Sequence, residues 1–72
     1  MTPDQVKIMI KRIARLIRKT REDLGISSYR LCEDIGINKG QFHQYEKTGS
    51  GLGLKNFLIV LYYLSLKIEK KK

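Results

Sequence analysis

A long amphipathic segment at the start of the chain is the feature that most restricts the fold. Between residues 3 and 24, apolar side chains recur at the spacing of one helix face, and basic side chains cover the opposite side. In a chain of 72 residues, a helix of this length strongly favours a helical fold. The apolar face contains Val6, Ile10, Ile13, Ile17 and Leu24, flanked by Met9, Ala14 and Leu16, and only Ile8 lies among the basic residues.

Start and stop signals bound this first helix. Thr2 is placed to cap it, Pro3 suits its first position, and Gln5 would complete a capping box with Thr2. Gly25 suits the left-handed conformation that commonly ends a helix. We therefore expect the helix to run from about residue 3 to residue 24.

Two shorter helices are predicted next. Ser27 is a good N-cap for a helix over about 28–34, and Asn38 for a helix over about 39–47. Gly36 suits a left-handed turn between them. Two short helices joined in this way form a helix-turn-helix unit, here over about residues 27–47. The side chains expected to face inward are Leu31, Cys32, Ile35, Phe42 and Tyr45.

A glycine-rich loop and a fourth helix complete the chain. Residues 48–53 are a loop by composition, and a helix is predicted from Leu54 to about Tyr63. Residues 64–69 alternate apolar and polar side chains, a pattern compatible with a short C-terminal strand. We expect a single all-α domain over 1–72, with four to five helices, and a solubilising tail at the final lysines. The predicted core of the last helix is Phe57 with the leucines Leu58, Leu61 and Leu64.

The formal charge of +8 indicates a polyanionic partner, either nucleic acid or an anionic membrane surface. The basic face of the first helix has no aromatic anchors beside it, which disfavours the membrane, although solubility alone also accounts for such charge. Cys32 is the only cysteine, so neither a disulfide nor a metal site is expected, and no cofactor. Without a signal-like start, the cytoplasm is the expected location.

The outer side of the helix over 39–47 carries the candidate functional residues. It has neither an aliphatic side chain nor an acid, and glutamine and lysine are side chains that read base edges. This side indicates contact with the major groove of DNA. No paired carboxylates, Cys–His couple or phosphate-binding glycine loop points to an enzyme. The candidate base contacts are Lys39, Gly40, Gln41, His43 and Gln44, with Gln41 at the edge of the arc.

These residues resemble the lambda-repressor-like, or Cro/XRE-type, helix-turn-helix DNA-binding family. The resemblance covers about residues 17–66 and is carried by "IRKTREDLGISSYRLCEDIGINKGQFHQYEK" and "LKNFLIVLYYLSL". It implies that Gly36 is the turn glycine and that Arg21 and Glu46 form a partly buried ion pair. It also implies phosphate contacts from Ser28, Lys47, Ser50 and Lys55.

The chain departs from the family pattern at three places. Cys32 stands where the family usually has alanine, and Thr48 stands where it usually has glycine, so Gly49 is expected to act one position later. The first helix is also longer at its N-terminus, and the family gives that extension no role.

The sequence therefore predicts a DNA-binding transcriptional regulator, a repressor that binds a pseudo-palindromic operator as a homodimer through the helix over 39–47. The alternative is a protein-interaction module, such as an antitoxin-type partner of a toxin. Two elements could form the dimer: the extended first helix, or residues 64–69 paired as a strand with their symmetry mate. The second is narrowly preferred, because an edge strand is marginal unless it is paired.

Overall fold

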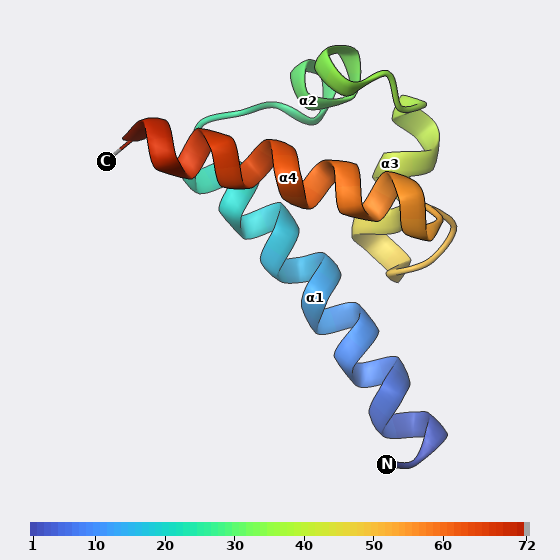
Figure 1. The fold of residues 1–72 in the computed structure, drawn as a ribbon. Helices are drawn as coiled ribbons and strands as arrows, with labels where there is room; N and C mark the ends of the chain where they lie inside the picture. The colour runs from blue at the N-terminus through green and yellow to red at the C-terminus, as the bar shows by residue number, and fades with distance from the viewer. Residues whose placement is uncertain (72) are drawn as a thin grey trace.

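The computed structural model describes residues 1–71, which form four α-helices and no strand (Figure 1). The helices are α1 (Pro3–Asp23), α2 (Ser28–Ile35), α3 (Lys39–Thr48) and α4 (Leu54–Lys71). The all-α class is confirmed, and Lys72 of the predicted tail lies outside the described residues. None of these helices combines the length and the apolar character needed to span a bilayer.

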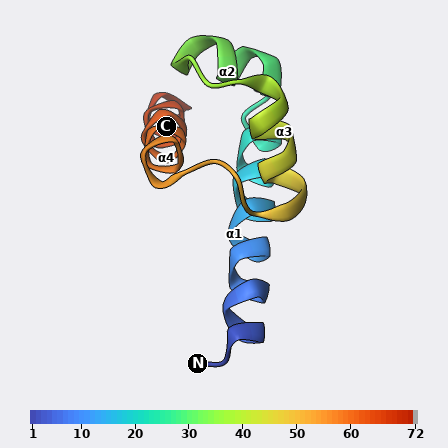
Figure 2. The same ribbon diagram turned by 90° about the vertical axis from the view of Figure 1, so that its right-hand side faces the viewer.

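Helix α1 is the axis on which the other helices are arranged. Figure 2 shows α3 and α4 on opposite sides of α1, with α2 at the end where α1 finishes. Helix α2 contacts both α3 and α4. The first turns of α1 project beyond the rest of the molecule (Figures 1 and 2).

The predicted helix starts are confirmed. Thr2 and Gln5 form a capping box, in which the Thr2 N–H donates to Gln5 Oε1 at 2.9 Å and the Gln5 N–H donates to Thr2 Oγ1 at 3.2 Å. The Ser27 hydroxyl accepts from the Arg30 N–H, and the Asn38 side chain accepts from the Gln41 N–H, each at 3.0 Å. Local sequence therefore sets where each of these helices begins.

The core lies where the C-terminal half of α1 meets α2, α3 and α4. Leu31, Phe42 and Val60 are fully buried, and Cys32 is 2% exposed. Burial also raises the pKa of the Cys32 thiol above its usual value, since the thiolate would lose hydration. The remaining buried residues of this cluster are Ala14, Ile17, Ile37, Tyr45, Leu52 and Leu64.

The predicted strand over 64–69 is wrong, because α4 continues without interruption to Lys71. Leu64 is buried one turn after Val60, and Lys67 is half-buried one turn later, which is helical spacing. Residues 64–71 contain neither glycine nor proline to end the helix. A dimer formed by pairing residues 64–69 as strands, which the sequence narrowly favoured, is therefore excluded.

The expected core of the last helix was too large, and the apolar face of the first helix is only partly buried. In α1, Ile17 is buried, but Val6, Ile10 and Ile13 are each about two-fifths exposed. In α4, Leu58 is 54% exposed and Leu61 is 39% exposed, although both were predicted to be core. In α1 the cause is its protrusion, since its first turns extend past the body and have no helix packed against them (Figure 1).

A hydrogen bond between Tyr63 and Asp34 joins α4 to α2. The Tyr63 hydroxyl donates to Asp34 Oδ2 at 2.6 Å. This bond is the main reason that the pKa of Asp34 lies below its usual value, with help from nearby Arg30. The pKa of Tyr63 is raised, first by burial and then by the same bond.

Tyr63→Phe should lower stability over a defined pH window. Because the pKa of Asp34 is lower in the folded state, its hydrogen bond with Tyr63 contributes to the free energy of unfolding. This contribution is complete above the unfolded pKa of about 4 and is lost as the pH falls through the folded pKa. The raised pKa of Tyr63 likewise contributes to the free energy of unfolding. That contribution is complete below about pH 10 and is lost as the pH rises through the folded pKa of Tyr63. Urea unfolding should therefore show the largest difference between wild type and Tyr63→Phe between these limits. Tyr62→Phe, at a 67% exposed tyrosine, should show none.

Gly49 allows α3 to end directly against α1. It ends α3 in a left-handed conformation, with φ of 80° and its N–H donating to the Tyr45 carbonyl at 2.7 Å. A Cβ atom at this position would lie 2.6 Å from Ile10 Cγ2 and 3.1 Å from the Ile10 carbonyl oxygen. Gly49 thus has the helix-ending role expected of it, and it brings the loop after α3 into contact with α1.

Gly49→Ala should lower stability by about 2–4 kcal/mol, because the left-handed backbone penalty adds to a steric overlap. Gly36→Ala is a matched control: Gly36 also ends a helix with φ of 73°, but no atom lies within 4 Å of its added Cβ. The free energy of unfolding of Gly36→Ala should fall by only about 1–2 kcal/mol. Equal losses in urea unfolding would show that the contact with Ile10 contributes nothing.

Candidate nucleic-acid interface

The turn between α2 and α3 is held rigidly by backbone hydrogen bonds. The Cys32 carbonyl accepts from the Gly36 N–H at 2.8 Å and from the Ile37 N–H at 3.1 Å. Gly36 has the left-handed conformation predicted for it, and the Ile37 side chain is buried. These two hydrogen bonds to one carbonyl fix the direction of the chain between α2 and α3.

The inner side of α3 is fixed by aromatic packing. Phe42 and Tyr45 are buried, with ring centroids 6.5 Å apart, and Tyr45 packs edge to face with Phe57 from α4, with ring centroids 6.2 Å apart. Both inward positions of α3 were predicted correctly. Because these rings point to the core, the opposite side of α3 must face outward.

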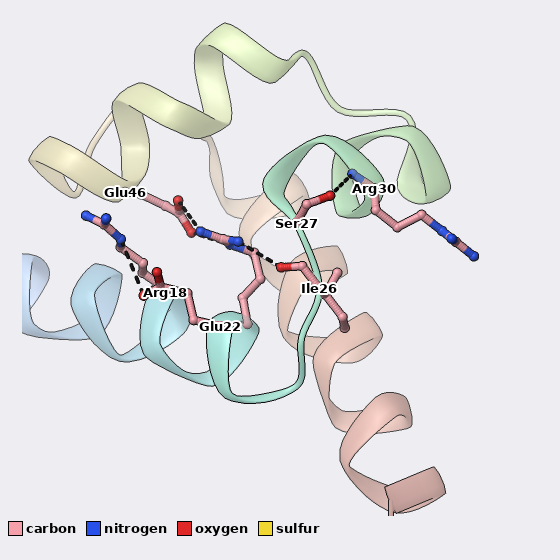
Figure 3. Close-up of polar contacts among 7 residues, drawn as sticks. Arg18, Glu22, Ile26, Ser27, Arg30 and Glu46 are labelled. Carbon is pink, nitrogen blue, oxygen red and sulfur yellow. Dashed lines mark hydrogen bonds and ion pairs between the residues drawn. The ribbon is translucent and has the colours of Figure 1, made fainter.

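The ion pair between Arg21 and Glu46 joins α1 to α3 as the resemblance implied (Figure 3). Arg21 Nε donates to Glu46 Oε2 at 3.0 Å and Nη2 donates to Oε1 at 3.2 Å, in a two-bond arrangement. Arg21 Nη1 also donates to the Ile26 carbonyl at 2.8 Å. The two side chains are 10% and 6% exposed. One guanidinium therefore connects the last turn of α1, the loop before α2, and α3.

The outer side of α3 is basic and polar. Lys39, His43, Gln44 and Lys47 are all exposed, and the only acid in α3 is Glu46, which Arg21 neutralises. Four of the predicted DNA contacts therefore share one accessible side of one helix. Gly40 lies on the same side.

Tyr29 is a residue of this surface that sequence reasoning missed. It lies in the first turn of α2, is 56% exposed, and carries Lys39 Nζ 3.3 Å from its ring centroid. The attraction between an ammonium group and an aromatic face restricts the position of Lys39. Helical periodicity could not reveal this contact, because it joins two helices across the turn.

Two predicted base contacts have structural roles as well. The Gln41 side-chain amide donates to the Gly51 carbonyl at 2.6 Å, which ties α3 to the loop that follows it. A Cβ atom at Gly40 would lie 3.3 Å from Asn38 Oδ1, the oxygen that caps α3. Glycine at this position therefore leaves room for the cap, in addition to any close approach of a ligand.

The predicted phosphate contacts are distributed over three helices and one loop. Ser28 begins α2 and is half-buried, Lys55 is exposed in the first turn of α4, and Lys47 lies on α3. Ser50 lies in the loop after α3, where its N–H donates to Thr48 Oγ1 at 3.3 Å and the two hydroxyls are 3.2 Å apart. Only Lys47 shares a helix with the candidate base contacts.

Comparison with known proteins returned no matching family model, no similar curated protein and no similar solved structure. Within residues 1–71, no group of His, Cys, Asp and Glu side chains is arranged to hold a metal ion.

Glu46→Ala should lower stability by about 3–5 kcal/mol, because it leaves the buried Arg21 guanidinium without its anion. Glu33→Ala, at an exposed glutamate of α2, should change stability by less than about 0.5 kcal/mol. Replacing both partners, as Arg21→Met with Glu46→Leu, should recover part of the loss, although the Ile26 carbonyl then lacks its donor. Urea unfolding of the wild type, the two alanine variants and the double variant checks this prediction. Glu46→Ala being as stable as Glu33→Ala would contradict it.

Proposed function

We propose that this chain is a lambda-repressor-like helix-turn-helix protein that binds double-stranded DNA sequence-specifically and acts as a transcriptional repressor, with α3 in the major groove. The observation that supports this most strongly is the two-sided character of α3. Its inner side is fixed by Phe42, Tyr45 and Glu46, while its outer side presents only basic and polar side chains.

Charge supports a polyanionic ligand for this surface. The chain carries +8, and no unpaired acid lies on α3 to repel a phosphate. Lys47, in the last turn of α3, and Lys55, in the first turn of α4, are the natural partners of the DNA backbone. Such contacts position the protein on the duplex without reading its sequence.

Base recognition falls to the middle and start of α3. Gln44 is exposed and can form two hydrogen bonds with an adenine edge. Lys39 can donate to guanine O6 and N7, and its contact with Tyr29 reduces the rotamer entropy it loses on binding. Gln41 is a weaker candidate than it was from the sequence, since its amide is bonded to Gly51.

Repression requires no more than occupation of a promoter. One helix-turn-helix unit reads only a few base pairs, so useful specificity normally takes two units on half-sites about one helical turn apart. We therefore expect the preferred DNA site to be an inverted repeat.

Selection of bound duplexes from a random library, followed by titrations of the enriched site, tests this function. Gln44→Ala should relax preference at one base position by about 1–3 kcal/mol. Lys47→Ala should weaken binding to all sequences alike and make the salt dependence shallower by about one unit of slope. Lys70→Ala removes the same charge near the end of α4 that lies farthest from α3 (Figure 1). It should change neither the base preference nor the salt dependence of binding.

Two outcomes would refute the proposal. No enriched sequence, with weak binding that disappears as salt is raised, would mean that net charge alone attracts DNA. Gln44→Ala and Lys47→Ala having identical effects on the selected and on random duplexes would show that α3 does not read bases. Either result would favour the alternative, a protein-interaction module.

A further inference from the structure

An apolar trough runs between α1 and α4, and one end of it reaches the C-terminal end of α3 at Tyr45 and Gly49. One end is lined by Ile10, Ile13, Leu54 and Phe57, together with the loop after α3. Ile13 also lines the other end, so the two hollows adjoin at this side chain. We call this surface the α1–α4 trough; its second end is lined by Ile13, Leu16, Ile17, Thr20, Leu61, Leu64, Ser65 and Ile68.

The walls of the trough are exposed to an extent that is unusual for large apolar side chains. Leu16 is 62% exposed and Leu54 is 73% exposed, while Met9, which continues the stripe toward the start of α1, is 44% exposed. A single exposed leucine needs no explanation, but a continuous group along two helices is typical of an interaction surface.

The total surface of the chain indicates how much is left uncovered. A compact monomer of 8.4 kDa is expected to expose roughly 4,600 Å². This chain exposes 5407 Å². The excess of about 800 Å² equals what one partner buries in a protein–protein interface of standard size.

The projecting part of α1 gives an independent reason for a partner. Residues 1–13 are all exposed, and the contact of Ile10 with Gly49 is where this half of the helix meets the body. Helices in proteins owe most of their stability to packing of the apolar face, and short unpacked ones are marginal in water. The apolar stripe of Val6, Met9 and Ile13 is the kind of helix face that binds in an apolar groove of a partner.

The distribution of charge indicates which partner fits. Residues 56–66 of α4 contain no charged side chain, so two such walls can meet without bringing like charges together. The basic residues Arg12, Arg15 and Lys19 lie beyond Leu16, at the outer edge of the trough. An isologous contact uses the same patch on both subunits, which this surface allows because it contains both a groove and an apolar helix end.

We propose that the α1–α4 trough is the docking surface for a second copy of this chain, with the first turns of each α1 lying in the trough of the other subunit. Among the described residues that line the trough there is none from the outer side of α3 (Lys39, His43, Gln44 and Lys47), so that side stays free in both copies. Self-association can therefore be measured without DNA, and its failure is distinct from failure of DNA binding.

Sedimentation equilibrium of the wild-type protein over about a hundredfold range of concentration should show a monomer–dimer equilibrium. The dimer should tighten as salt is raised, because salt screens the repulsion between two chains of +8 and favours apolar burial. Leu16→Glu and Leu61→Glu, which place a charge in the trough, should each weaken the dimer by about tenfold or more.

Matched controls separate the trough from apolar surface in general. Leu66 lies on another side of α4 with 41% exposure, close to the 39% of Leu61, and Ile8 is 52% exposed on the basic side of α1. Leu66→Glu and Ile8→Glu should each change the dimerisation constant by less than about twofold. Circular dichroism of all four variants should show unchanged helix content.

Three outcomes would overturn the proposal. A wild-type chain that stays monomeric over the whole range has no such interface. A dimer that resists both trough substitutions but is broken by Leu66→Glu or Ile8→Glu forms elsewhere. A dimer that weakens as salt is raised is held by charge, and an acidic partner for the basic edge would then replace the second copy.

Discussion

The buried ion pair between Arg21 and Glu46 is the interaction on which the arrangement of the helices depends. Three donors of one guanidinium reach the carboxylate of α3 and the carbonyl of Ile26 in the loop before α2. A fold of 72 residues has a total stability of only about 4–11 kcal/mol, so removing one partner, which leaves the other charge buried and alone, would cost a large part of it. The pair also sets the rotation of α3, because Glu46 can be reached only when Phe42 and Tyr45 face the core.

Local sequence predicted most of the helix boundaries, because capping is a short-range interaction. Thr2, Ser27 and Asn38 each accept a hydrogen bond from a backbone N–H three residues later, and Gly36 and Gly49 adopt the left-handed conformation expected of them. The pair of Arg21 and Glu46 was inferred from the resemblance, and the structure shows the contact directly. The course of the chain through the helix-turn-helix unit could therefore be anticipated without coordinates.

The failures share one physical cause, which is that periodicity reports a pattern and not what packs against it. Leu64 and Leu66 fit a strand as well as a helix, and only the burial of Leu64 beside Val60 decides between them. The apolar stripe of α1 was predicted from its spacing alone, and no second helix covers its first turns. The contact of Lys39 with Tyr29 likewise depends on the angle between two helices, which no local pattern encodes.

The burial of Cys32 has a consequence for following the protein in solution. Its thiol is the only one in the chain, lies in α2 beneath the turn to α3, and is kept protonated by a pKa that burial raises. A thiol reagent can reach it only when α2 separates from the core, and it reacts with the thiolate that forms then. The rate of alkylation thus measures how often the helix-turn-helix unit opens, and a ligand bound across α2 and α3 would slow it without touching the sulfur atom.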